Sequence, residues 1–108
     1  MAMSDLKTAL ASTGYKFAHY AWSKAPSGDY GVYGEEGSSD FIANGVHVEK
    51  GTIGYIDYFT RDDSGAPKTA IETALNGLNI PWRVNTISYE PDTGYIHYEW
   101  VWGLYGDL

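Results

Sequence analysis

The sequence predicts an α+β fold in which an antiparallel sheet of about four strands carries two helices on one face. Two segments have helical periodicity, and the other apolar residues alternate with polar ones along extended runs. Thirteen glycines supply turns between those runs. The expected element order is α-β-β-β-α-β-β, in a single domain over residues 1–108 that includes a projecting β-hairpin or long loop.

Residues 4–13 have the pattern of a short amphipathic helix. Ser4 is expected to cap its first turn, and Asp5 suits the positive end of the helix dipole. Gly14 is expected to end it. The aromatic residues 15–22 then favour a strand.

The middle of the chain predicts two strands separated by a projecting arm. Residues 29–35 have strand-like alternation. Residues 36–51 are expected to project as a hairpin or long loop, because Asn44–Gly45 is a strong two-residue hairpin signal. Residues 52–61, rich in Ile, Tyr and Phe, predict the central strand.

A second helix is predicted over residues 67–78. Pro67 fits its first turn, where a missing N–H costs nothing. Apolar residues recur there with the spacing of one helical face, namely Ile71, Ala74, Leu75 and Leu78.

The C-terminal third predicts a β-hairpin. Residues 82–90 and 95–103 are strand-like and are joined by a turn sequence, residues 91–94. One face of the second run carries Ile96, Tyr98, Trp100 and Trp102. These rings could form a ligand platform together with Trp82, but a core face beneath the helices is the favoured interpretation.

Composition excludes several classes of function. Fourteen acidic and seven basic residues give a net charge of −7, and the basic residues form no cluster that would grip nucleic acid. The chain has no cysteine, so disulfide and thiolate chemistry are excluded. Neither a signal segment nor a bilayer-length apolar run is seen, and a soluble cytoplasmic product without membrane contact is expected.

No catalytic constellation is evident in the sequence, and we expect a non-enzymatic protein with no cofactor and no catalytic, cofactor-binding or metal-binding residues. His97 and Glu99 would share a strand face and could form an acid–base or metal pair, yet no third partner can be named. The acidic pairs Glu35–Glu36 and Asp62–Asp63 lie beside glycines, and solvated carboxylates are the favoured interpretation over a metal site.

Several weak motifs, in a consistent order, resemble those of the tail-completion proteins (head–tail joining, tail-terminator-like) of long-tailed bacteriophages and prophages of Gram-positive bacteria. The similarity runs from Leu6 to about Gly103. The similar pieces are Phe17–Tyr20, Tyr30–Tyr33, Asp40–Gly45, Tyr55–Thr60, Ile71–Glu72 with Leu75, Ile80–Trp82 and Tyr95–Trp100. Asp57 departs from the family, in which a glutamate is expected at that place in the central strand.

The resemblance implies a structural subunit of the virion neck, assembled in the host cytoplasm. Such subunits form a homo-oligomeric, usually hexameric, ring between the head connector (stopper) protein and the major tail tube protein, and DNA passes through its lumen without specific binding. The resemblance implies no catalytic residues for this chain, and it implies that residues 40–50 form the projecting loop. Candidate subunit contacts are Asp40, Phe41, Asn44, His47, Glu49 and Lys50 in that loop, and Tyr105 beyond the last predicted strand.

Two other functions stay open. The first is a non-phage protein-binding or ligand-binding module that uses an aromatic sheet face. The second is a small enzyme with an acidic site near His97 and Glu99.

Overall fold

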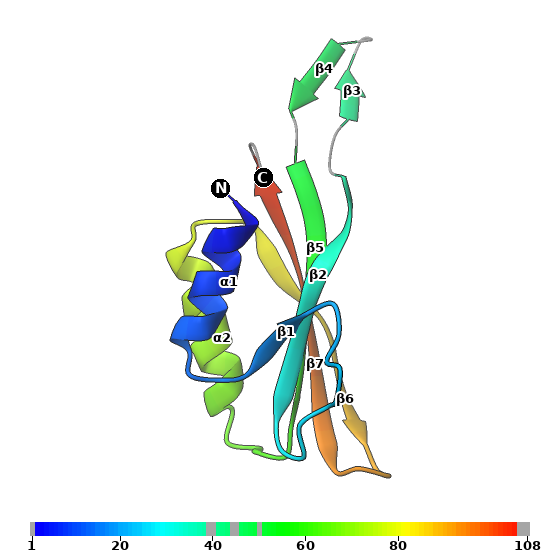
Figure 1. Ribbon diagram of the computed structural model, residues 1–108. Helices are drawn as coiled ribbons and strands as arrows, with labels where there is room; N and C mark the ends of the chain where they lie inside the picture. The colour runs from blue at the N-terminus through cyan, green and yellow to red at the C-terminus, as the bar shows by residue number, and fades with distance from the viewer. Residues whose placement is uncertain (1, 39–40, 44–45, 50, 106–108) are drawn as a thin grey trace.

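The computed structural model describes residues 2–38, 41–43, 46–49 and 51–105, and within them it has the predicted α+β class (Figure 1). Two helices accompany a five-stranded sheet and a separate two-stranded hairpin. The elements are α1 (Met3–Ser12), β1 (Phe17–His19), β2 (Tyr30–Ser38), β3 (Phe41–Ala43), β4 (Val46–Glu49), β5 (Gly51–Thr60), α2 (Ala66–Gly77), β6 (Trp82–Glu90) and β7 (Tyr95–Tyr105).

The main sheet has the strand order β1-β2-β5-β7-β6. Every neighbouring pair is antiparallel except β1 and β2, which run parallel. The prediction of a purely antiparallel sheet of about four strands is therefore wrong in strand number and at this edge. The cause is the connection through residues 20–29, which carries the chain back so that β2 runs in the same direction as β1.

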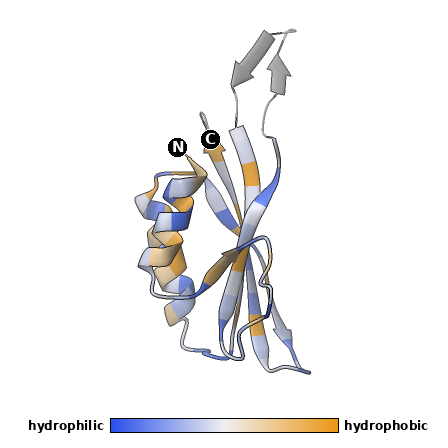
Figure 2. Cartoon of the chain, in the orientation of Figure 1, coloured by the Kyte–Doolittle hydropathy of each residue, from blue (hydrophilic) through white to orange (hydrophobic). Residues whose placement is uncertain are grey.

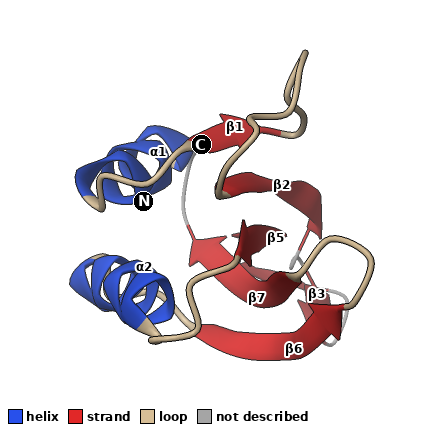
Figure 3. Cartoon of the chain, turned by 90° about the horizontal axis from the view of Figure 1, so that it is seen from below, coloured by secondary structure: helices blue, strands red, loops and turns tan. Residues whose placement is uncertain are grey.

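Both helices lie on one face of the sheet, as predicted (Figure 3). The core forms between the layers, and Figure 2 shows hydrophobic stretches in both helices. Among the described residues, four helix residues and seven strand residues form the core: Leu6, Leu10, Ile71 and Leu75 from the helices, and Tyr33, Ile56, Tyr58, Tyr98, Trp100, Trp102 and Leu104 from the strands. The prediction that the aromatic face of the last strand is buried beneath the helices is confirmed.

The start of α1 differs from the prediction. The N-cap is Ala2, not Ser4, and the Ala2 backbone N–H donates to Asp5 Oδ2 over 3.0 Å. The Asp5 carboxylate thus satisfies a backbone group at the helix N-terminus, where its charge is also favoured. Gly14 follows the helix with φ +82°, and Pro67 lies in the first turn of α2, both as predicted.

The predicted projecting arm is present. Strands β3 and β4 pair antiparallel and extend beyond the ends of β2 and β5 (Figure 1). The molecule accordingly measures 49 Å along its longest axis and 27 and 26 Å across. The Asn44–Gly45 turn falls outside the described residues. None of the helices in the described part of the chain is long and apolar enough to cross a bilayer.

Candidate functional site on the uncovered sheet face and its edges

One face of the main sheet carries no helix in the described part of the chain (Figure 3). Because side chains alternate along a strand, the neighbours of buried Ile56, Tyr58 and Trp100 point to this uncovered face. The strand register brings three central strands together there, with Tyr30 and Val32 from β2, Tyr55, Asp57 and Phe59 from β5, and Tyr95, His97, Glu99 and Val101 from β7.

A hydrogen-bonded polar network occupies the middle of the uncovered face. His97 Nε2 lies 2.9 Å from Asp57 Oδ1, and His97 Nδ1 lies 3.9 Å from Glu90 Oε2. Asp57 is paired across the sheet with Glu99. Glu99 Oε1 accepts a hydrogen bond from Asn85 Nδ2 over 2.5 Å. The carboxylates of Asp57 and Glu90 therefore lie within 4 Å of the imidazole, and the Glu99 carboxylate lies next to Asp57.

Burial raises the pKa of Asp57 above its usual value. The hydrogen bond from His97 and its charge oppose this shift, whereas the nearby Glu99 carboxylate adds to it. Only 18% of the Asp57 side chain is exposed, so the desolvation outweighs the favourable contact with His97. The ionised form of Asp57 is consequently less stable in the folded protein than in the unfolded chain.

Asp57→Asn is expected to remove a pH dependence of stability. Folding raises the pKa of the Asp57 carboxyl group. Asp57 therefore stabilises the folded state at pH values below its pKa in the unfolded chain, and this contribution is lost as the pH rises through its pKa in the folded protein. The asparagine keeps an oxygen for His97 and has no charge to desolvate. Urea unfolding from pH 4 to pH 8 should show that the variant gains stability relative to wild type as pH rises. A difference that is constant over this range would contradict the assignment.

Glu35→Gln provides a control of opposite sign. Burial alone would raise the Glu35 pKa, but hydrogen bonding, chiefly from His19 Nε2 at 2.5 Å, holds the pKa below its usual value. Glu35 therefore favours the folded state above its unfolded pKa, and this contribution is lost as pH falls through the folded pKa. The variant should lose stability relative to wild type as pH rises. Glu35 is thus a partnered carboxylate in β2, whereas a solvated one was predicted.

An aromatic cluster adjoins the polar network. The Phe59 ring stacks on His97 with centroids 4.2 Å apart and on Tyr30 with centroids 4.9 Å apart. Tyr95 meets both Tyr30 and Phe59 edge to face, and the Arg61 guanidinium lies 4.1 Å from its ring centroid. These ring contacts hold the aromatic side chains of the uncovered face in fixed positions.

The sequence predicted part of this arrangement. His97 and Glu99 do share a face, but His97 pairs with Asp57 and Glu99 with Asn85, not with each other. Asp57 was missed as a partner because it lies 40 residues away in sequence. The described residues contain no group of three or more His, Cys, Asp or Glu side chains that could hold a metal ion. In the second acidic pair, Asp62 Oδ1 accepts a hydrogen bond from the Ser64 backbone N–H over 2.9 Å.

Strand β6 forms one outer edge of the sheet, because it pairs only with β7. Two large apolar side chains are exposed there, Ile87 at 55% and Tyr89 at 64%. A register shift between Val84 and Thr86 interrupts the pairing within the strand. An unpaired strand edge offers backbone donors and acceptors to another chain, and the two apolar side chains add contact area.

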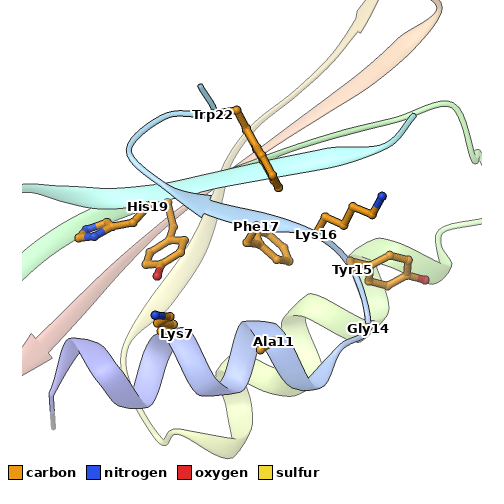
Figure 4. Close-up of a pocket in the computed structure, with 9 residues that line it drawn as sticks. Lys7, Ala11, Gly14, Tyr15, Lys16, Phe17, His19 and Trp22 are labelled. Carbon is orange, nitrogen blue, oxygen red and sulfur yellow. The ribbon is translucent and has the colours of Figure 1, made fainter. Parts of the chain in front are cut away.

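A cavity of about 570 Å³ opens at the other outer edge, between α1 and β1 (Figure 4). Lys7 comes from α1, Lys16 directly precedes β1, Phe17 begins β1, and Trp22 lies beyond the end of that strand. The Trp22 indole donates to the Gly31 carbonyl oxygen over 2.9 Å, which fixes that ring. No motif in the sequence indicated this cavity.

The predicted subunit contacts fall largely on the projecting arm. Asp40, Asn44 and Lys50 lie outside the described residues. The backbone places Phe41 in β3 opposite Glu49 of β4. The other two predicted contacts are also strand residues, His47 in β4 and Tyr105 opposite Gly51 at the end of β7.

No protein-family model matches the chain, and no curated protein matches it either. A functional assignment must therefore come from the two sheet edges, the uncovered face and the arm.

Proposed function

We propose that the protein is a structural subunit of a bacteriophage neck, which assembles into a ring that joins the head connector to the tail tube. Its location would be the virion. The motif order in the sequence supports the phage setting. The geometry supports the assembly role, because the chain has an arm that projects from the body and an outer strand, β6, whose far edge pairs with no other strand in the described residues.

One observation carries the proposal, namely the exposed edge of β6 with Ile87 and Tyr89. Monomeric proteins usually blunt a long edge strand with charges, prolines, bulges or a covering element. This edge has a register shift between Val84 and Thr86, but beyond it two large apolar side chains are exposed, and tyrosine is enriched at the energetically important positions of interfaces. A surface of this kind suits a subunit that meets another polypeptide.

The charge of the chain suits a channel for DNA. A net charge of −7 makes a ring of several copies strongly negative. A lumen of the same sign as the phosphate backbone would let DNA slide through without binding to it. The carboxylates Asp57 and Glu99 on the uncovered face make that face a suitable lining.

Sedimentation velocity and negative-stain electron microscopy of the purified full-length chain test the assembly role. We expect concentration-dependent formation of closed rings. A monomer at every concentration, also with the connector and tail tube proteins present, would contradict it. The phage setting is tested separately by deleting the gene from its genome, which should leave filled heads and unattached tails.

A further inference from the structure

Charge is distributed unevenly along the chain. The first 28 residues contain three of the seven basic residues, Lys7, Lys16 and Lys24, and one of the fourteen acids, Asp5. This part of the chain is therefore locally positive in a protein of net charge −7. It includes α1 and β1, which border the cavity at one edge of the sheet.

The cavity combines cationic groups with aromatic walls. Lys7 and Lys16 line it, and neither forms an ion pair with another described residue. Its aromatic lining consists of Tyr15, Phe17, Trp22 and Tyr33. Its volume of about 570 Å³ lies within the roughly 300–1,000 Å³ of pockets that hold ligands. An aromatic side chain next to carboxylates would complement it, since lysine ammonium groups attract both.

The opposite edge of the sheet presents such a group. The β6–β7 tip, residues 87–94, exposes Ile87 and Tyr89 and carries Glu90 and Asp92. Glu90 and Asp92 flank Pro91 directly after the exposed tyrosine. The tip is held in place by Arg61, whose Nε donates to the Thr93 carbonyl oxygen over 2.9 Å.

One molecule cannot bring its own tip to its own cavity. Strands β1 and β6 are the two outer strands of a five-stranded sheet, with β2, β5 and β7 between them. At the usual spacing of neighbouring strands, this separates the edges by roughly 19 Å. A tip that fills the cavity would therefore have to come from another molecule.

We infer that a second copy of this chain fills the cavity, with the β6–β7 tip of one copy docking between α1 and β1 of the next through Tyr89, Glu90 and Asp92. The inference rests on the proposed ring function and names the surfaces that would form the ring. Contact between two different surfaces is heterologous, and such contacts close into rings when the rotation per copy allows. The arm, which projects from the end of the sheet, stays free to reach a different partner.

Charge exchange between the two surfaces tests this inference. One double variant, Lys7→Glu with Lys16→Glu, makes the cavity acidic. A second double variant, Glu90→Lys with Asp92→Lys, makes the tip basic. Each should weaken self-association at least about tenfold, because attraction becomes repulsion at two charge pairs. An equimolar mixture should restore assembly, since every cavity then meets a tip of opposite charge.

The variant with all four substitutions is the matched control, because it has the wild-type net charge and should assemble alone. Tyr89→Ala tests the apolar contact without changing charge and should weaken assembly by about tenfold or more. Circular dichroism melts will identify any variant that is unfolded, and if a charge variant is unfolded, Tyr89→Ala decides the question. Sedimentation velocity at low and high salt measures all of them.

The failures of the two proposals are distinguishable. If wild type forms rings and the folded charge variants or Tyr89→Ala form them equally well, the docking surfaces are wrong while the ring function stands. Failure of the mixture or the fourfold variant to assemble also contradicts the docking surfaces. If wild type forms no ring under any condition, both proposals fail together.

Discussion

Gly54→Ala is expected to destabilise the protein by about 3 kcal/mol or more, a large part of the total for a domain of this size. A Cβ atom on Gly54 would lie 2.2 Å from the Gly34 carbonyl oxygen and 2.3 Å from the Trp102 ring. The first contact is with backbone of the neighbouring strand and the second is with a buried ring, so neither can move aside without disturbing the sheet or core. Urea unfolding followed by tryptophan fluorescence measures the loss.

Gly37→Ala is the matched control, because it makes the same chemical change in the neighbouring strand β2. A Cβ atom at Gly37 would meet no other atom within 4 Å. The expected change is within about 0.5 kcal/mol of wild type. Equal losses for both variants would show that a general cost of alanine in the sheet, and not the close approach at Gly54, is responsible.

The elements with strong periodicity were predicted well from the sequence. In α2 the spacing of Ile71 and Leu75 identified the buried face, and both side chains are fully buried. In β7 the two-residue alternation identified Trp100 and Trp102 as core residues. Periodicity succeeds here because burial on one face selects the residue type at each position directly.

The edge of the sheet was predicted less well. The aromatic residues 15–22 favoured one long strand, yet β1 covers only Phe17–His19. Tyr20 ends the regular backbone with φ +69°, a conformation that side-chain hydrophobicity does not reveal. The parallel pairing of β1 with β2 depends on the path of the following loop, and local propensity contains no information about that path.

The candidate surfaces were only partly predictable for a similar reason. The face shared by His97 and Glu99 follows from their spacing, whereas the contact with Asp57 depends on the register between β5 and β7. The exposure of Tyr89 depends on β6 being an outer strand. Strand order and register arise from long-range pairing, so a single strand's sequence does not determine them.

Trp100→Ala is expected to cost about 3–5 kcal/mol of folding free energy. Trp100 is completely buried in the core that joins the helices to the sheet, so its removal leaves a large cavity. Its indole N–H also donates to Glu72 Oε2 of α2 over 2.9 Å, and the carboxylate would lose this partner. Thermal and urea unfolding, followed by circular dichroism because a tryptophan is lost, measure the change.

Two controls separate the causes of this loss. Val101→Ala alters the next residue of β7, which is half-buried on the uncovered face, and should cost about 1 kcal/mol. Trp100→Phe keeps most of the apolar volume but removes the bond to Glu72, so its cost should fall between those of the two alanine variants. If Val101→Ala proved the more damaging substitution, the stabilising contacts of β7 would lie on the side away from the helices. The uncovered face would then be required for folding and could not be an open surface for assembly.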